Sequence, residues 1–177
     1  FQAAKAIIEK EIERHARRGH QQPASVRIGA MIEVPALAWQ LNSLLPLVDF
    51  VSVGTNDLMQ YFFASDRGNT LVSDRYDLLS PAALSFLKGV LDKSLEAGVE
   101  ISLCGEAAGQ PLEAMALIGL GFRNISMPPA AVGEVKEMIR SLDASALASY
   151  LGTLLDRPEH SLRVRLQNFA RDHDTET

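Results

Sequence analysis

Polar side chains that can bind a metal ion or move a proton follow the apolar stretches of this sequence, where each stretch ends. In chain order they are Glu33, Asn56, Asp57, Cys104, Glu106 and Ser126. Carboxylate and amide oxygens bind hard divalent cations, and a thiol can act as a general acid. These residue types therefore favour metal-assisted chemistry that includes a proton transfer.

The two carboxylates Glu33 and Asp57 suit an open magnesium site. Mg²⁺ takes oxygen ligands and usually keeps water or substrate phosphate in its remaining positions. Two carboxylates are too few for a closed structural site, and no loop shows the alternating acidic residues of a calcium site. The alternative interpretation is that Glu33 and Asp57 only cap helices.

Cys104 is the single cysteine of the chain and stands directly before Gly105. A lone cysteine is commonly an inert core residue, but its place at the end of an apolar stretch favours a chemical role. No histidine lies near it in sequence, so a nucleophilic Cys–His pair is not indicated, whereas a thiol acting as a general acid is.

Arg67 lies in the polar, glycine-containing segment SDRGN. A guanidinium in such a segment can hold a carboxylate or a phosphate with two parallel hydrogen bonds. The alternative is a solvated arginine, or one that forms a local ion pair with Asp66.

The elements that must position these residues alternate along the chain. Strands are predicted over 26–32, 48–53, 99–103 and 122–127. Helices are predicted over 1–18, 36–45, 58–63, 81–97, 111–119 and 130–140, with one or two more in 143–173. This alternation predicts an α/β fold with a parallel sheet, and short apolar strands are typical of a barrel core. Because the strands of a parallel barrel end on one face, the polar residues above should meet there.

Composition and charge exclude several classes of function. The 177 residues are 47% hydrophobic, enough for a sizeable core, and the net charge of −5 argues against nucleic acid or acidic membrane as partner. No apolar stretch reaches the roughly 20 residues that cross a bilayer, and no signal peptide is evident. We expect a cytoplasmic protein and, since the sequence begins with Phe1, a piece of a longer polypeptide.

Five sequence blocks carry a resemblance to a known family. They are MIEVPA, GTNDLMQY, SDRGN, CGEAAG and ISM, in that order. Together they resemble the C-terminal domain of the phosphoenolpyruvate-protein phosphotransferases, enzyme I of the sugar phosphotransferase system. The segment SMPPAAVG is more similar to the nitrogen-type paralogue. The resemblance implies that residues 1–177 form one partial domain, the C-terminal half of a TIM-type (β/α)₈ barrel with four βα units and flanking helices.

The resemblance also implies a role for each site residue. Glu33 and Asp57 match the magnesium ligands; Asn56, Asp57, Arg67 and Gly105 match the contacts to phosphoenolpyruvate; Cys104 matches the residue that protonates the enolate carbon as pyruvate forms. The phosphoryl group would pass to a histidine of a separate N-terminal domain and then to a histidine-containing phosphocarrier protein. A homodimer is implied as well.

Other readings and one physical consequence stay open on sequence alone. The chain is also compatible with a barrel fragment of phosphoenolpyruvate synthase or pyruvate phosphate dikinase, or with a regulatory or dimerisation module that lacks catalysis. In a half-barrel, alternate strand residues should form an apolar layer that the missing half leaves uncovered. We therefore expect the isolated chain to self-associate and to form no pyruvate by itself.

Overall fold

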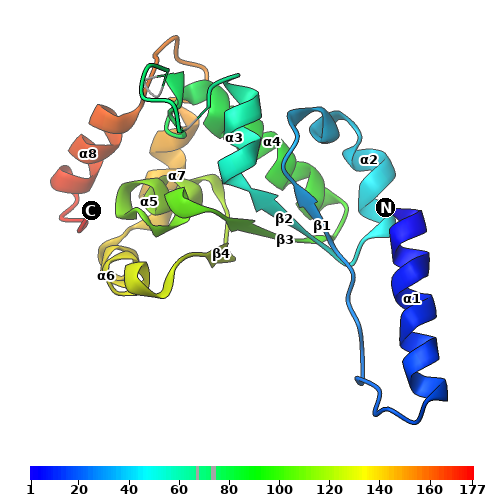
Figure 1. Ribbon diagram of the computed structural model, residues 1–177. Coiled ribbons are helices and arrows are strands. Elements are labelled where there is room, and N and C mark those ends of the chain that lie inside the picture. Colours follow the sequence, from blue (N-terminus) through cyan, green and yellow to red (C-terminus); the bar gives the residue numbers. More distant parts are fainter. Residues whose placement is uncertain (67, 73–74) are drawn as a thin grey trace.

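A four-stranded parallel sheet with helices against it organises the computed structural model, which describes residues 1–66, 68–72 and 75–177 (Figure 1). The strands pair in the order β1-β2-β3-β4. Their bounds are Ala30–Ile32 for β1, Phe50–Gly54 for β2, Glu100–Cys104 for β3 and Ile125–Ser126 for β4. The α/β class and the parallel pairing are thus confirmed. Among the described residues the sheet is open, since β1 and β4 do not pair with one another.

The helices follow the predicted order, with ends set by local capping. The α-helices are α1 (Gln2–Arg17), α2 (Leu41–Leu44), α3 (Thr55–Phe62), α4 (Pro81–Glu96), α5 (Pro111–Leu120), α6 (Val132–Ser141), α7 (Ala144–Gly152) and α8 (Arg163–Asp172), and short 3₁₀ turns include η1 (Pro35–Trp39), η2 (Leu45–Leu47), η4 (Glu106–Gly109) and η5 (Pro129–Ala131). The Ser80 hydroxyl accepts a hydrogen bond from the backbone N–H of Ala83 at the start of α4. Gly121 ends α5 in the left-handed conformation that glycine adopts without strain.

Two predicted strands are shorter than expected. The backbone N–H of Ile28 donates to the Asp49 carboxylate instead of to a neighbouring strand, so the ladder begins only at Ala30. Phe122 is fully buried, and its N–H donates to the carbonyl of Leu117, so it completes the end of α5 and leaves β4 to Ile125–Ser126. The strand predictions over 26–32 and 122–127 were wrong at these ends, because side-chain and helix-end contacts replaced the ladder.

The single helix predicted over 36–45 was also wrong. The segment forms η1, α2 and η2 in succession. Gln40 leaves the helical region with φ −108° and ψ 6°, which separates η1 from α2. Pro46 lies within η2 and lacks the backbone N–H that an α-helix would use there.

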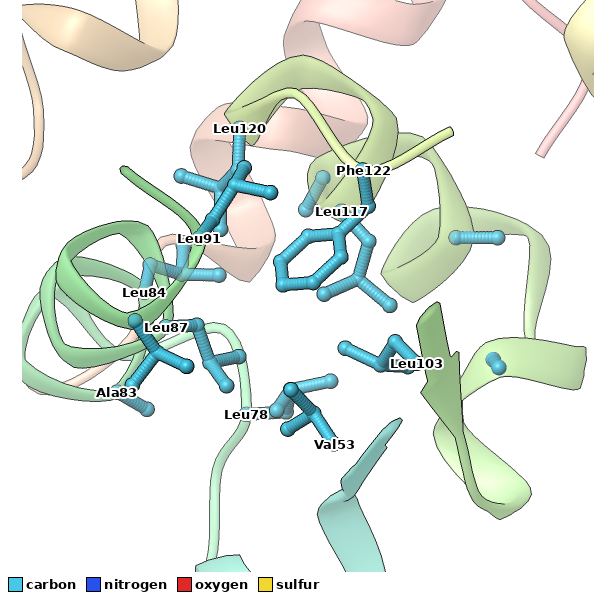
Figure 2. Packing of buried hydrophobic residues seen from close by; sticks show 14 of the residues in the cluster. Val53, Leu78, Ala83, Leu84, Leu87, Leu91, Leu103, Leu117, Leu120 and Phe122 are labelled. Carbon is cyan, nitrogen blue, oxygen red and sulfur yellow. The ribbon is translucent and has the colours of Figure 1, made fainter. Parts of the chain in front are cut away.

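One face of the sheet is covered and apolar. Its side chains alternate along the strands with those of the other face, and they include Val51, Val53, Ile101 and Leu103, all buried. Figure 2 shows Val53 and Leu103 directed toward leucines of α4 and α5 and toward Phe122. This face supplies the hydrophobic core that holds the strands in place.

The opposite face is uncovered, and it is not apolar. It carries Met31, Ser52, Ser102, Cys104 and Ser126, each partly or largely exposed. The expectation of an uncovered apolar layer was wrong, because the apolar side chains of the strands pack against the helices on the covered face. The uncovered face therefore offers no apolar layer through which two chains would associate.

Helix α1 begins beside α2, and its C-terminal end extends away from the rest of the chain (Figure 1). None of its residues, all of which the structure describes, is buried. The Lys5 ammonium reaches the carbonyl oxygen of Leu47 at 3.4 Å, and Ile7 is 65% exposed. In the described part of the chain, no helix has both the length and the hydropathy needed to cross a membrane.

The two faces of β3 should respond differently to truncation. Leu103→Ala should lower the free energy of unfolding by about 2–5 kcal/mol, because it removes a fully buried side chain from a packed core. Ser102→Ala, the neighbouring residue on the uncovered face, should change it by less than about 1 kcal/mol. Urea denaturation of both variants measures the difference, and equal losses would contradict the assignment of the faces.

Candidate functional site

The register of β2 against β3 places the candidate residues at one edge of the sheet. Gly54 pairs with Cys104, and Ser52 pairs with Ser102 two residues earlier. Both strands run in the same direction, so the segments that leave them start side by side. Strand β2 passes directly into α3, and β3 passes through Gly105 into η4.

Asn56 and Glu106 join these two segments. The backbone N–H of Glu106 donates to the side-chain oxygen Oδ1 of Asn56 at 3.1 Å. Because a backbone N–H can only donate, this bond fixes the amide oxygen toward η4 and turns the amide nitrogen the other way. That nitrogen has no acceptor among the described residues, so its two N–H groups remain available to an anionic ligand.

Gly105 makes the close approach of the two segments possible. Its φ of 135° is a backbone conformation that residues with a side chain rarely adopt. A Cβ at this position would overlap the hydroxyl of Thr55 and lie 3.0 Å from Oδ1 of Asn56. The Thr55 hydroxyl in turn donates to the carbonyl oxygen of Cys104 at 3.0 Å. Glycine is therefore a requirement of the geometry here.

The thiol of Cys104 is half-buried on the uncovered face of the sheet. The hydroxyl of Ser52 donates to Sγ at 3.6 Å from the adjacent strand. Since the sulfur accepts this hydrogen bond, its own S–H proton can point elsewhere and can be donated. The sequence analysis missed Ser52. Strand alternation could have found it, because Ser52 lies between the buried Val51 and Val53 and so faces the other side of the sheet, as Cys104 does.

A cavity of about 510 Å³ lies beside these residues, with both polar and apolar groups in its lining. Its lining consists of Asn56, Gly68, Tyr76, Glu106, Ala107 and Gln110. The Tyr76 hydroxyl donates to the carbonyl oxygen of Thr55 at 3.4 Å, and its ring lies 6.1 Å from that of Phe63, centroid to centroid. Tyr76 is a second residue that sequence reasoning missed, since nothing in the segment 65–79 singled it out. Cys104 is the last residue of β3 and does not line the cavity.

Glu33 leaves β1 and lies over Gly54. A Cβ on Gly54 would meet Cγ and Oε1 of Glu33 at 2.9 Å, so the missing side chain leaves the space that the carboxylate occupies. Asp57 is exposed in the first turn of α3. Both follow the ends of adjacent strands, and carboxylate oxygens are the kind of ligand that Mg²⁺ takes.

Two further expectations concern a cluster of metal ligands and Arg67. Among the described residues, no group of three or more His, Cys, Asp or Glu side chains could hold a metal ion. The prediction for Arg67 lies outside the described residues, whereas its neighbour Gly68 lines the cavity.

Alanine at Gly105 should disturb this arrangement. Gly105→Ala should cost about 1–3 kcal/mol of unfolding free energy, because it strains the backbone and collides with Thr55. Gly89→Ala is the control: Gly89 lies within α4 with no atom within 4 Å of an added Cβ, so alanine should raise stability by about 0.5–1 kcal/mol. Thermal unfolding distinguishes the two, and a neutral Gly105→Ala would contradict the close approach.

Comparison with known proteins identifies the family. Residues 1–144 match the family model described as "PEP-utilising enzyme, PEP-binding domain". The chain is 46% identical over 117 residues to a Salmonella typhimurium protein named "Phosphoenolpyruvate-dependent phosphotransferase system"; this covers 66% of the chain and 16% of that protein. It is 39% identical over 139 residues to the Borreliella burgdorferi "Phosphoenolpyruvate-protein phosphotransferase", covering 78% of the chain and 24% of the relative.

A third relative extends the match toward the C-terminus. The Latilactobacillus sakei "Phosphoenolpyruvate-protein phosphotransferase" is 37% identical over 156 residues, which are 88% of this chain and 27% of that protein. The chain thus spans between about a sixth and a quarter of the length of these relatives. The matched model covers most of the sequence and includes every residue of the candidate site. The chain belongs to the family of PEP-utilising enzymes, as a PEP-binding domain.

Proposed function

We propose that this chain is the phosphoenolpyruvate-binding part of a phosphoenolpyruvate-protein phosphotransferase. In this proposal a longer polypeptide moves the phosphoryl group of phosphoenolpyruvate to a histidine of its own N-terminal domain, then to a histidine-containing phosphocarrier protein, and releases pyruvate. The names of the similar proteins support this reading. The observation that carries it is the β2–β3 register, which brings the Asn56 amide and the Cys104 thiol to one edge of the sheet.

The substrate would be held mainly by donors of hydrogen bonds. The amide N–H groups of Asn56 face away from Glu106 and can donate to a carboxylate or phosphate oxygen. We assign a further contact to Arg67 because a guanidinium matches the geometry of either group. Gly105, whose missing side chain makes room for Thr55 and Asn56, would contact the substrate through its backbone, and Asp57 would add a contact shared with the metal site.

Glu33 and Asp57 are the residues that would hold Mg²⁺. Bound there, the ion would neutralise charge on the phosphate and the enolate oxygen. The protein would place these ligands: the absence of a side chain at Gly54 leaves room for the Glu33 carboxylate, and Asp57 lies in the first turn of α3, which follows the neighbouring strand.

Cys104 would supply the proton that turns the enolate into pyruvate. The P–O bond of phosphoenolpyruvate breaks as the phosphoryl group passes to histidine, which leaves an enolate whose methylene carbon needs one proton. The S–H group gives that proton, and the resulting thiolate regains one from solvent. Ser52 orients the thiol, since its hydroxyl occupies a lone pair of the sulfur and leaves the S–H directed elsewhere.

The open sheet would be completed by chain outside these residues. In a (β/α)₈ barrel the helices cover the outside of the sheet, so the uncovered face with Ser52, Ser102 and Cys104 would face the interior. We therefore propose the C-terminal half of a (β/α)₈ barrel, part of a cytoplasmic enzyme that works as a homodimer.

Replacing the thiol separates binding from proton transfer. In the full-length enzyme, Cys104→Ala should retain phosphoenolpyruvate binding but lower pyruvate formation by at least about 100-fold, because it removes the acid. Ser102→Ala, on the same strand and face, is the control and should stay within about threefold of wild type. Pyruvate release measured with a coupled assay decides this, and a Cys104→Ala rate equal to that of the control would exclude the thiol from the mechanism.

Changing either carboxylate should weaken magnesium binding and so raise the magnesium requirement. Glu33→Gln and Asp57→Asn should each raise the Mg²⁺ concentration for half-maximal rate by at least about tenfold, because each deletes one of few protein ligands. Asp92→Asn removes an exposed carboxylate of α4 that pairs with Lys88, so it controls for the change in charge. If all three variants keep the wild-type requirement in a magnesium titration, the metal assignment is wrong.

A further inference from the structure

Two walls of the cavity are tied together by one arginine from the C-terminal part of the chain. Tyr76 and Gln110 line the cavity, and each is close in sequence to a carboxylate, Asp77 and Glu113. The guanidinium nitrogen Nη2 of Arg163 lies 2.6 Å from Oε1 of Glu113 and 3.6 Å from Oδ1 of Asp77. Arg163 is the first residue of α8, so one side chain from this helix contacts the neighbours of both walls.

The electrostatics of this contact differ from those of a surface ion pair. The side chains of Asp77 and Glu113 are only 15% and 12% exposed. Two largely buried carboxylates that share one cation repel each other when it is removed, which is more costly than losing an exposed pair. Burial opposes the charge on Arg163, but the hydrogen bond and charge of Glu113, with the charge of Asp77, outweigh it and raise the pKa of the guanidinium above its ordinary value.

The backbone reinforces the same connection. The N–H of Leu162 donates to the carbonyl oxygen of Leu79 at 2.8 Å, directly before α8. Within the segment that follows Tyr76, the backbone N–H of Leu79 donates to Oδ1 of Asp77 at 2.9 Å. Asp77 is thus engaged from two directions, by its own segment and by Arg163. The segment from Asp77 to Ser80 contains no helix or strand, and these contacts join it to α8 in addition to the burial of Leu78 and Leu79.

We propose that Arg163 is a positioning residue for the substrate cavity, and that α8 fixes the distance between the Tyr76 wall and the Gln110 wall. Arg163 lies beyond residues 1–144 that match the family model, in the C-terminal part of this chain. The identity of the substrate, phosphoenolpyruvate, rests on the proposed function; the mechanical link does not. Without Arg163 the two carboxylates separate and the cavity loses its preformed width, which weakens binding more than the chemical step.

The test compares two arginines of the same helix. Arg163→Met removes the link, whereas Arg165→Met removes an ion pair to Glu159 at 2.6 Å that lies apart from the cavity lining. The side chains of the two arginines are similarly exposed, at 43% and 40%. Arg163→Lys keeps a charge but, as a point donor, satisfies one carboxylate instead of spanning both, so it should restore the wild-type behaviour only in part.

The first readout is amide hydrogen exchange in the 177-residue chain. Arg163→Met should speed exchange of the Leu79 and Leu162 amides at least about tenfold, because both bonds depend on the held segment, and Arg165→Met should leave them unchanged. Equal exchange at these amides in the two variants would overturn the link.

The second readout is steady-state kinetics of the full-length enzyme. Arg163→Met should raise the KM for phosphoenolpyruvate at least about fivefold with kcat within about twofold, and Arg165→Met should change neither. If the KM values of the two variants agree although exchange differs, the link exists but does not position the cavity, and the inference is wrong. A wild-type enzyme that does not consume phosphoenolpyruvate would instead refute the proposed function, while the exchange result still decides the link.

Discussion

The parallel pairing of β2 with β3 is the constraint on which the candidate site depends. A ladder fixes neighbouring strands at a spacing of about 4.7–4.9 Å and alternates their side chains between two faces. A slip of one residue would turn Cys104 toward the helices and bring Leu103 to the uncovered face. Because Leu103 is fully buried against the helix layer, packing on one face determines which chemistry stands on the other.

The glycines at the ends of these two strands have different structural roles. At Gly54 the missing side chain makes room for the carboxylate of Glu33 from the neighbouring strand. At Gly105 both the backbone angle and the space matter, since Thr55 and Asn56 occupy the place of a Cβ. Small residues at strand ends thus let polar groups from adjacent segments meet, which larger side chains would prevent.

The site also depends on parts of the chain that are far from it in sequence. The segment that leads into α4 supplies Tyr76 to the cavity, and its Leu78 and Leu79 are buried in the core. The backbone contact between Leu79 and Leu162 and the charges around Arg163 join it to α8 as well. Because these carboxylates are largely buried, removing their single arginine partner costs more free energy than breaking an exposed ion pair does.

Sequence by itself determined the order of the elements, the parallel α/β class and the family to which the chain belongs. Local signals suffice there, since the Ser80–Pro81 helix start and the apolar runs at 48–53 and 99–103 depend on neighbours in the chain. Tertiary structure alone decided which face of the sheet stays uncovered, how Asn56 meets Glu106, and that Ser52 contacts Cys104. It also shortened the strands at Ala30 and Ile125 and split the helix at Gln40. The uncovered face and the contacts of Asn56 and Ser52 arise between residues distant in sequence, and neither periodicity nor motif spacing encodes the partner of such a contact.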